Sequence, residues 1–148
     1  MLKLPNFTDP ISIQEYLDAL AYNITDRTLS PRDVEREGMA HCMDGAVFAA
    51  TALESFGYPP LLVDLRAIDD DDHVIAVFRD SGLWGAVAKS NTTSLRFRPP
   101  VHRSIRELAL SYFAGLLPDH PLYAYWMQCI RRFVQYKYGT EMAVDGPN

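Results

Sequence analysis

The chain has 148 residues, of which 48% are hydrophobic and 22% are charged, and its formal net charge is −5. These values predict one globular domain over residues 1–148 and argue against nucleic acid as a partner, since nucleic-acid binding needs a basic face. No apolar run approaches the roughly 18–20 residues of a membrane span, and the opening MLKLPNFTDP lacks the apolar core of a signal peptide. We therefore expect a cytoplasmic protein without a membrane partner.

The first third of the chain is predicted to be helical. Apolar residues recur at helical spacing in DPISIQEYLDALAYNIT, residues 9–25. A short second helix begins after Ser30, with Pro31 at its first position, and ends at Gly38. The third helix runs from about Cys42 to Phe56 and is apolar around most of its circumference, so we expect it to be buried.

Strands are predicted in the middle of the chain. The apolar, branched stretch PPLLVDLRAI, residues 59–68, indicates one strand. After an acidic run, residues 73–80 and 83–90 flank Ser81-Gly82 and indicate a β-hairpin with a tight turn. Residues 92–100 suggest a further strand, closed by its two prolines.

Two helices are expected to finish the domain. Apolar stripes predict the first over residues 105–116 and the second over residues 121–133, while the tail 142–148 is expected to be frayed. Cys129 falls within the stripe of the second helix and is expected to pack in the core. The order of helices, then strands, then helices predicts an α+β fold in which a buried helix packs on a short antiparallel sheet.

Cys42 is the candidate nucleophile because it stands at the head of the buried third helix. The free N–H groups and the macrodipole at a helix start favour a thiolate and lower the pKa of a thiol. On composition alone, a small residue in tight helix packing is the more ordinary role for this cysteine, and it is the candidate base His73 that favours a functional thiol. Asp44, two residues later, is expected to cap the helix rather than to act in catalysis.

His73 is the candidate base, because it opens a strand that can pack against the buried helix. Neighbouring residues of a helix point in different directions, so His41 is a poorer partner for the adjacent cysteine. The remaining histidines, His102 and His120, precede the last two helices and resemble loop or cap residues.

A histidine base also needs a group that orients its ring, and the paired strand should supply it. In the predicted hairpin His73 faces Ala88, and Ser90 is its diagonal neighbour on the same face. A slip or bulge of one residue would bring Lys89 and Asn91 to that face instead. Asn91 is chemically the better choice, since its amide oxygen can accept from an imidazole N–H, and Ser90 is the weaker alternative.

This arrangement resembles the transglutaminase-like superfamily of papain-type cysteine enzymes, over residues 40–91. The resemblance is carried by a cysteine at a helix start in HCMDGA, by the step into a strand in FGYPPLLVDL, and by a histidine strand with its partner in HVIAVFRDSGLWGAVAKSN. It implies a transglutaminase-like, papain-like core and thiol-dependent acyl chemistry, in the form of peptide or amide hydrolysis or of acyl transfer. It also implies a peptide or protein substrate and a site built on Cys42 and His73, which Asn91 from the predicted hairpin would complete as a triad.

The chain departs from that pattern at one position. The family's acid should follow Trp84 by about four residues, where Ala88 stands. Either Asn91 or Ser90 replaces it, or the triad is incomplete and the domain is a catalytically inactive binding or structural module. A third interpretation, a redox-sensing thiol, would need Cys129 close to Cys42 in space.

No metal or cofactor is expected. The acidic run 69–72 could in principle bind calcium, but it lacks the ligand spacing and the glycine of a calcium loop, so a solvated turn is the better interpretation. The chain has neither the ligand set of a zinc site nor the glycine spacing of a phosphate loop.

Overall fold

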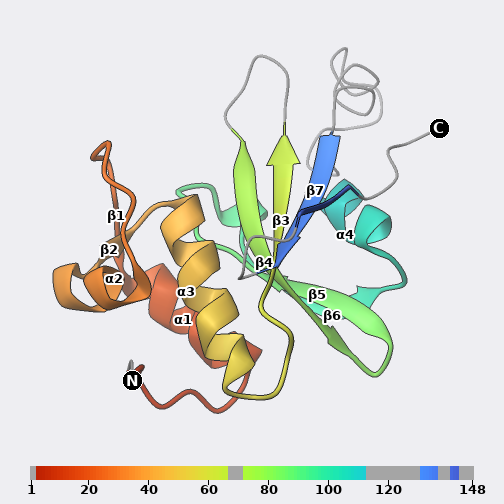
Figure 1. Ribbon diagram of the computed structural model, residues 1–148, viewed down its shortest axis with the longest axis horizontal. Coiled ribbons are helices and arrows are strands. Elements are labelled where there is room, and N and C mark those ends of the chain that lie inside the picture. The colour runs from red at the N-terminus through yellow and green to blue at the C-terminus, as the bar shows by residue number, and fades with distance from the viewer. Residues whose placement is uncertain (1–2, 67–71, 113–130, 137–140, 144–148) are drawn as a thin grey trace.

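The computed structural model describes residues 3–66, 72–112, 131–136 and 141–143, the last two ranges as strands. Within them, α-helices cover both faces of an antiparallel sheet (Figure 1), so the α+β class is confirmed. The elements of the sheet, in spatial order, are β6 (Arg98–His102), β5 (Leu83–Val87), β4 (His73–Asp80), β3 (Leu61–Arg66), β7 (Arg131–Tyr136) and β8 (Glu141–Ala143).

The first three helices begin close to their predicted starts. They are α1 (Pro10–Ala19), α2 (Pro31–Glu37) and α3 (Cys42–Glu54). Asp9 accepts from the backbone N–H of Ser12 and caps α1, and Ser30 caps α2 in the same way. Gly38 ends α2 with φ 66°, a conformation that glycine adopts without strain. A short parallel pair, β1 (Ala21–Tyr22) with β2 (Met39–Ala40), joins the segments on either side of α2.

The hairpin of β4 and β5 is confirmed, but its register differs from the prediction. Ser81 and Gly82 both have positive φ, 51° and 80°, as the turn requires. A loop of two residues sets its flanking residues opposite each other, so Asp80 pairs with Leu83 and the ladder runs to Ala76 opposite Val87. The predicted pairing of His73 with Ala88 was therefore wrong by two positions, and the ladder ends before it reaches His73.

The next segment contains a shorter strand than predicted. Residues 93–95 form a 3-10 turn, η1 (Thr93–Leu95), and the strand β6 begins only at Arg98. Pro99 and Pro100 lie inside this strand instead of closing it. They are tolerated because β6 is the edge of the sheet, where one side of the backbone needs no partner.

The C-terminal segment is only partly helical in the described residues. The helix expected over 105–116 is present as α4 (Ile105–Ser111). The helix expected over 121–133 cannot reach Phe133, because residues 131–136 form β7 and pair with β3. Residues 121–130, including Cys129, lie outside the described residues. In the tail expected to be frayed, residues 142–143 belong to β8, which pairs with β7.

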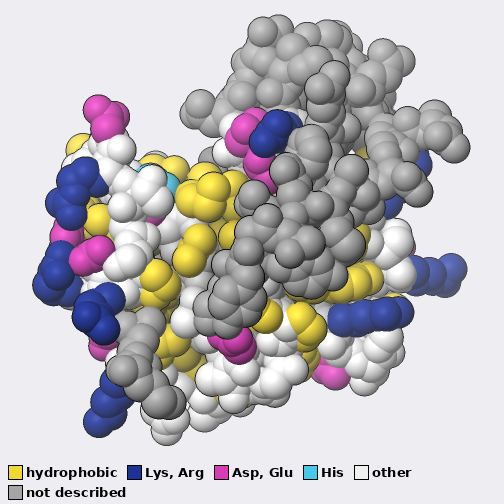
Figure 2. Space-filling model, in the orientation of Figure 1, with side chains coloured by type: hydrophobic (Ala, Val, Ile, Leu, Met, Phe, Trp, Pro, Cys, Tyr) yellow, Lys and Arg dark blue, Asp and Glu magenta, His cyan; other side chains and the backbone are white. Residues whose placement is uncertain are grey.

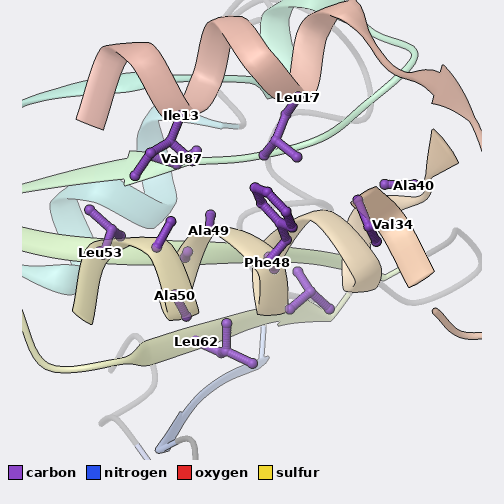
Figure 3. Close-up of a cluster of buried hydrophobic side chains, with 14 of the residues drawn as sticks. Ile13, Leu17, Val34, Ala40, Phe48, Ala49, Ala50, Leu53, Leu62 and Val87 are labelled. Atoms are coloured by element: carbon purple, nitrogen blue, oxygen red, sulfur yellow. The ribbon is translucent and has the colours of Figure 1, made fainter. Parts of the chain in front are cut away.

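Two hydrophobic clusters lie on opposite faces of the sheet. On one face, α3 packs over alternate side chains of β4 and α1 packs on α3 and β5. Figure 3 shows Ile13 and Leu17 of α1 pointing toward α3, and Phe48 of α3 pointing toward α1. On the other face, Ile75 and Val77 of β4 pack with α4. The predicted burial of α3 is confirmed, since most of its residues are buried.

The first turn of α3 touches the segment that follows β5. Lys89 is 3% exposed, and its Nζ donates to the carbonyl oxygens of Leu17 and Leu20, both at 2.6 Å, at the end of α1. Its stem runs so close to α3 that a Cβ at Gly45 would overlap the Cβ of Lys89. Glycine at position 45 therefore allows this approach between the helix and residues 88–90.

We expect Gly45→Ala to destabilise the protein by about 1–3 kcal/mol, the usual cost of overpacking a tight contact. Helix propensity alone predicts the opposite, a gain of about 1 kcal/mol. Urea unfolding of the wild type, of Gly45→Ala, of Lys89→Gly and of the double variant separates the two effects, because the penalty should shrink when Lys89 has no Cβ. A Gly45→Ala protein more stable than the wild type would contradict the close approach.

Candidate functional site

The candidate nucleophile lies at the start of α3, as predicted. Cys42 is the first residue of the helix and is half-buried, and its Sγ lies 3.8 Å from the carbonyl oxygen of Asp72, the residue before β4. The first hydrogen bond of the helix joins the N–H of Gly45 to the oxygen of His41. The N–H groups of Cys42 and Met43 precede this bond and have no acceptor within the helix, as at any helix start.

A buried carboxylate holds this helix start in place. His41 and Asp44 cap the helix reciprocally, since Nδ1 of His41 accepts from the N–H of Asp44 and the Asp44 carboxylate accepts from the N–H of His41. The same carboxylate, with no exposed surface, accepts from the side-chain amide of Asn23 at 3.0 Å and from the N–H of Leu29 at 2.7 Å. The predicted capping role of Asp44 is confirmed, and it extends to the whole loop between β1 and α2.

The imidazole of His73 is oriented by the main chain. Its Nε2 lies 2.7 Å from the carbonyl oxygen of Leu95, and its ring meets that of Tyr112 edge to face at 5.6 Å. A carbonyl oxygen only accepts, so Nε2 carries the proton and, in the neutral ring, Nδ1 is the free base. Burial lowers the pKa of His73. The bond to Leu95 opposes that shift, and the charge of Arg98 adds to it.

The structure brings Cys42 and His73 to the same end of β4 but does not join them. By strand alternation His73 shares a face with Ile75 and Val77, the face covered by α4, whereas α3 covers the face that carries Val74. Among the residues described, no hydrogen bond connects Sγ of Cys42 with a ring nitrogen of His73. The thiol instead meets the backbone that leads into His73.

The residues predicted to orient His73 are placed elsewhere. Asn91 is exposed, and no hydrogen bond to His73 is present in the part of the chain that the structure describes. The hydroxyl of Ser90 accepts from the N–H of Thr92 at 3.0 Å and closes a local turn. The orienting group is the carbonyl of Leu95, which sequence reasoning missed because a main-chain acceptor leaves no mark in the choice of residue.

Ala88, at the position where the family pattern would have an acid, follows directly after the end of β5. Gln14 of α1 donates to the carbonyl of Ala88 and accepts from its N–H, at 2.8 and 2.9 Å. Both backbone groups of Ala88 are thus taken by α1, and β5 leaves β4 at this point. Further along the hairpin, Trp84 lies opposite Arg79, whose guanidinium carbon stands 5.6 Å from the centroid of the indole ring, a cation–π contact between the paired strands.

Within the described ranges, no helix is long and apolar enough to cross a membrane, and no group of three ligating side chains could hold a metal ion. Most of the acidic run once considered for calcium, residues 69–71, lies outside these ranges, as does His120. On the face shown in Figure 2, Lys and Arg side chains stand in separate groups with acidic residues between some of them. No protein-family model matches the chain, and a comparison with curated proteins finds no match either.

We expect Asp44→Asn to be strongly destabilising, although it barely changes the size of the side chain. The amide keeps one acceptor oxygen and points an N–H₂ group at the donors of Asn23, Leu29 or His41. Each buried donor left unpaired costs about 1–3 kcal/mol. Urea unfolding measures the loss, and Asp33→Asn, at a half-exposed cap of α2, should lose much less. Equal losses in the two variants would contradict this account.

Acid should weaken the fold through His73. The imidazole of His73 binds a proton less readily in the folded protein than in the unfolded chain, where its pKa is about 6.5. The unfolding free energy therefore falls as the pH drops below about 6.5 toward the lowered native pKa, and this contribution is absent above that range. Urea unfolding at several pH values should show a weaker pH dependence in His73→Gln than in the wild type. His102→Gln is the control, and an unchanged dependence in His73→Gln would contradict the prediction.

Proposed function

We propose that this chain carries out thiol-dependent acyl chemistry, most simply the hydrolysis of a peptide or amide bond, with Cys42 as nucleophile and His73 as base. One observation carries the proposal: the bond from Nε2 of His73 to the carbonyl of Leu95 leaves Nδ1 as the basic nitrogen, at the end of β4 that the Cys42 thiol contacts. An oriented base that can reach a thiol at a helix start is what activates a cysteine.

In the proposed reaction the Cys42 thiol gives its proton to Nδ1 of His73, and the thiolate attacks the amide carbonyl carbon. The N–H of Cys42 donates to the oxyanion that forms. The imidazolium then protonates the leaving amine as the carbon–nitrogen bond breaks and a thioester remains. Water, deprotonated by His73, attacks the thioester, and the bond to sulfur breaks to release the carboxylic acid. The imidazolium then returns its proton to the Cys42 thiolate.

The chemistry requires the thiol and the imidazole to approach each other when substrate binds. Catalytic hydrogen bonds are often long or absent without substrate and tighten in the complex. Cys42 is half-buried and not part of the core, and the carbonyl of Asp72 lies next to its thiol, immediately before His73 in the chain. The order of α3, β3, β4 and β5 along the chain is also the order implied by the resemblance to transglutaminase-like enzymes, which supports the same assignment.

A second candidate function is a binding or structural module with a transglutaminase-like core and no chemistry. The observation that favours it is the placement of His73 on the face of β4 that packs against α4, in contact with Tyr112. In this alternative His73 is a core residue satisfied by Leu95, and Cys42 is an ordinary thiol.

Alkylation of Cys42 distinguishes the two candidates. In the catalytic case, iodoacetamide should label Cys42 faster than a free thiol near neutral pH, and His73→Ala should slow the labelling. Hydrolysis of p-nitrophenyl acetate should then show a burst of acyl-enzyme that Cys42→Ser abolishes and that His73→Ala slows by about 10²-fold, the usual effect of a general base.

The matched control is His102→Ala, since His102 is bonded to the carbonyl of Trp84 at the far end of the sheet from Cys42. It should leave both the labelling rate and the burst unchanged. A Cys42 that labels like a free thiol, with no effect of His73→Ala, would overturn the catalytic proposal and leave the binding module.

A further inference from the structure

We propose that Arg98 and Tyr112 are positioning residues for His73, which together hold its ring on the carbonyl of Leu95. The inference rests on the proposed function in one respect only, that His73 is a base whose orientation matters. Arg98 and Tyr112 come from β6 and from the end of α4, far from His73 in the sequence.

Arg98 fixes the peptide segment that carries the Leu95 carbonyl. Its guanidinium donates to the carbonyl of Ser94 at 2.6 Å and to that of Arg96 at 3.4 Å, the residues on either side of Leu95. The same group donates to the hydroxyl and the carbonyl of Ser111, at 3.0 and 3.2 Å. Arg98 therefore ties η1 to the last turn of α4, and the planar fork of arginine suits so many acceptors at once.

Tyr112 lies between Arg98 and His73. The guanidinium carbon of Arg98 stands 4.1 Å from the centroid of the Tyr112 ring, a cation–π contact, and the edge-to-face contact with His73 follows on from the same ring. Tyr112 is 5% exposed, and burial raises its pKa above the usual range, so its hydroxyl stays protonated and donates to the carbonyl of Arg96 at 2.8 Å. Both residues thus hold the peptide next to Leu95.

The arrangement also affects the charge of the imidazole. The groups that face His73 are the Leu95 carbonyl, the ring of Tyr112 and, behind that ring, the cation of Arg98; its strand partner on β3 is Leu65. The exposed Asp72 precedes it in the chain. A neighbouring cation disfavours the imidazolium, so Arg98 helps to keep His73 neutral while the carbonyl fixes which nitrogen carries the proton.

Nitrogen-15 NMR of the His73 ring tests this directly, because it reports tautomer and titration whether or not Cys42 is reactive. The wild type should show the Nε2–H tautomer and titrate below the usual pH. Arg98→Met should raise the pKa of His73, and Tyr112→Leu should give a mixture of tautomers. Tyr112→Phe keeps the ring against the imidazole but loses the hydroxyl that holds the Arg96 carbonyl, so its tautomer preference should lie between those of the wild type and Tyr112→Leu.

Arg79→Met is the matched control, since Arg79 also stands over an aromatic ring, that of Trp84, but in the described part of the chain it donates to the carbonyl of Gly82 and to none in the segment around Leu95. It should leave the His73 signals unchanged. Arg98→Lys keeps the charge without the fork and serves if Arg98→Met does not fold, as judged by circular dichroism; it should loosen the tautomer preference and leave the pKa low. Unchanged His73 signals in folded Arg98 and Tyr112→Leu variants would overturn the proposal, whereas failure of the proposed function would appear in Cys42 labelling alone.

Discussion

The buried carboxylate of Asp44 is the interaction on which the N-terminal end of α3 depends. It accepts from the main chain of His41 and Leu29 and from the side chain of Asn23, so it caps the helix and fixes the loop before α2 at once. A carboxylate can be buried without a cation when several donors satisfy its oxygens. The direction of α3, and with it the place of Cys42, follows from this one group.

A second constraint comes from α1, which sets the point at which β5 stops pairing with β4. Gln14 takes both backbone groups of Ala88, and Lys89 caps the last carbonyls of α1 while its stem passes Gly45. The chain is therefore drawn away from β4 after Val87 and passes beside the first turn of α3. As a result the beginning of β4 has no partner from β5, and η1 supplies the Leu95 carbonyl to His73 instead.

Local signals in the sequence predicted the helix starts, the hairpin turn and Cys42 at the head of a buried helix. They depend on neighbouring residues, such as Ser30 before Pro31 or the pair Ser81-Gly82. The orienting group could not be predicted, because any residue at position 95 offers the same carbonyl oxygen. The strand at 131–136 was missed because a short apolar run fits the spacing of a helix as well as that of a strand. Here pairing with β3, which the local sequence does not reveal, makes it a strand.

The Leu95 carbonyl also changes what His73 can contribute. A carboxylate at Ala88 would stabilise the imidazolium and so favour a thiolate–imidazolium pair before substrate arrives. A carbonyl fixes the tautomer but carries no charge, and burial together with Arg98 lowers the pKa of the ring. Cys42 would then meet a neutral base, and its proton would move only as attack begins. His73 would thus act as a general base during the attack itself, and by accepting the thiol proton at that moment it would still speed the reactions of Cys42.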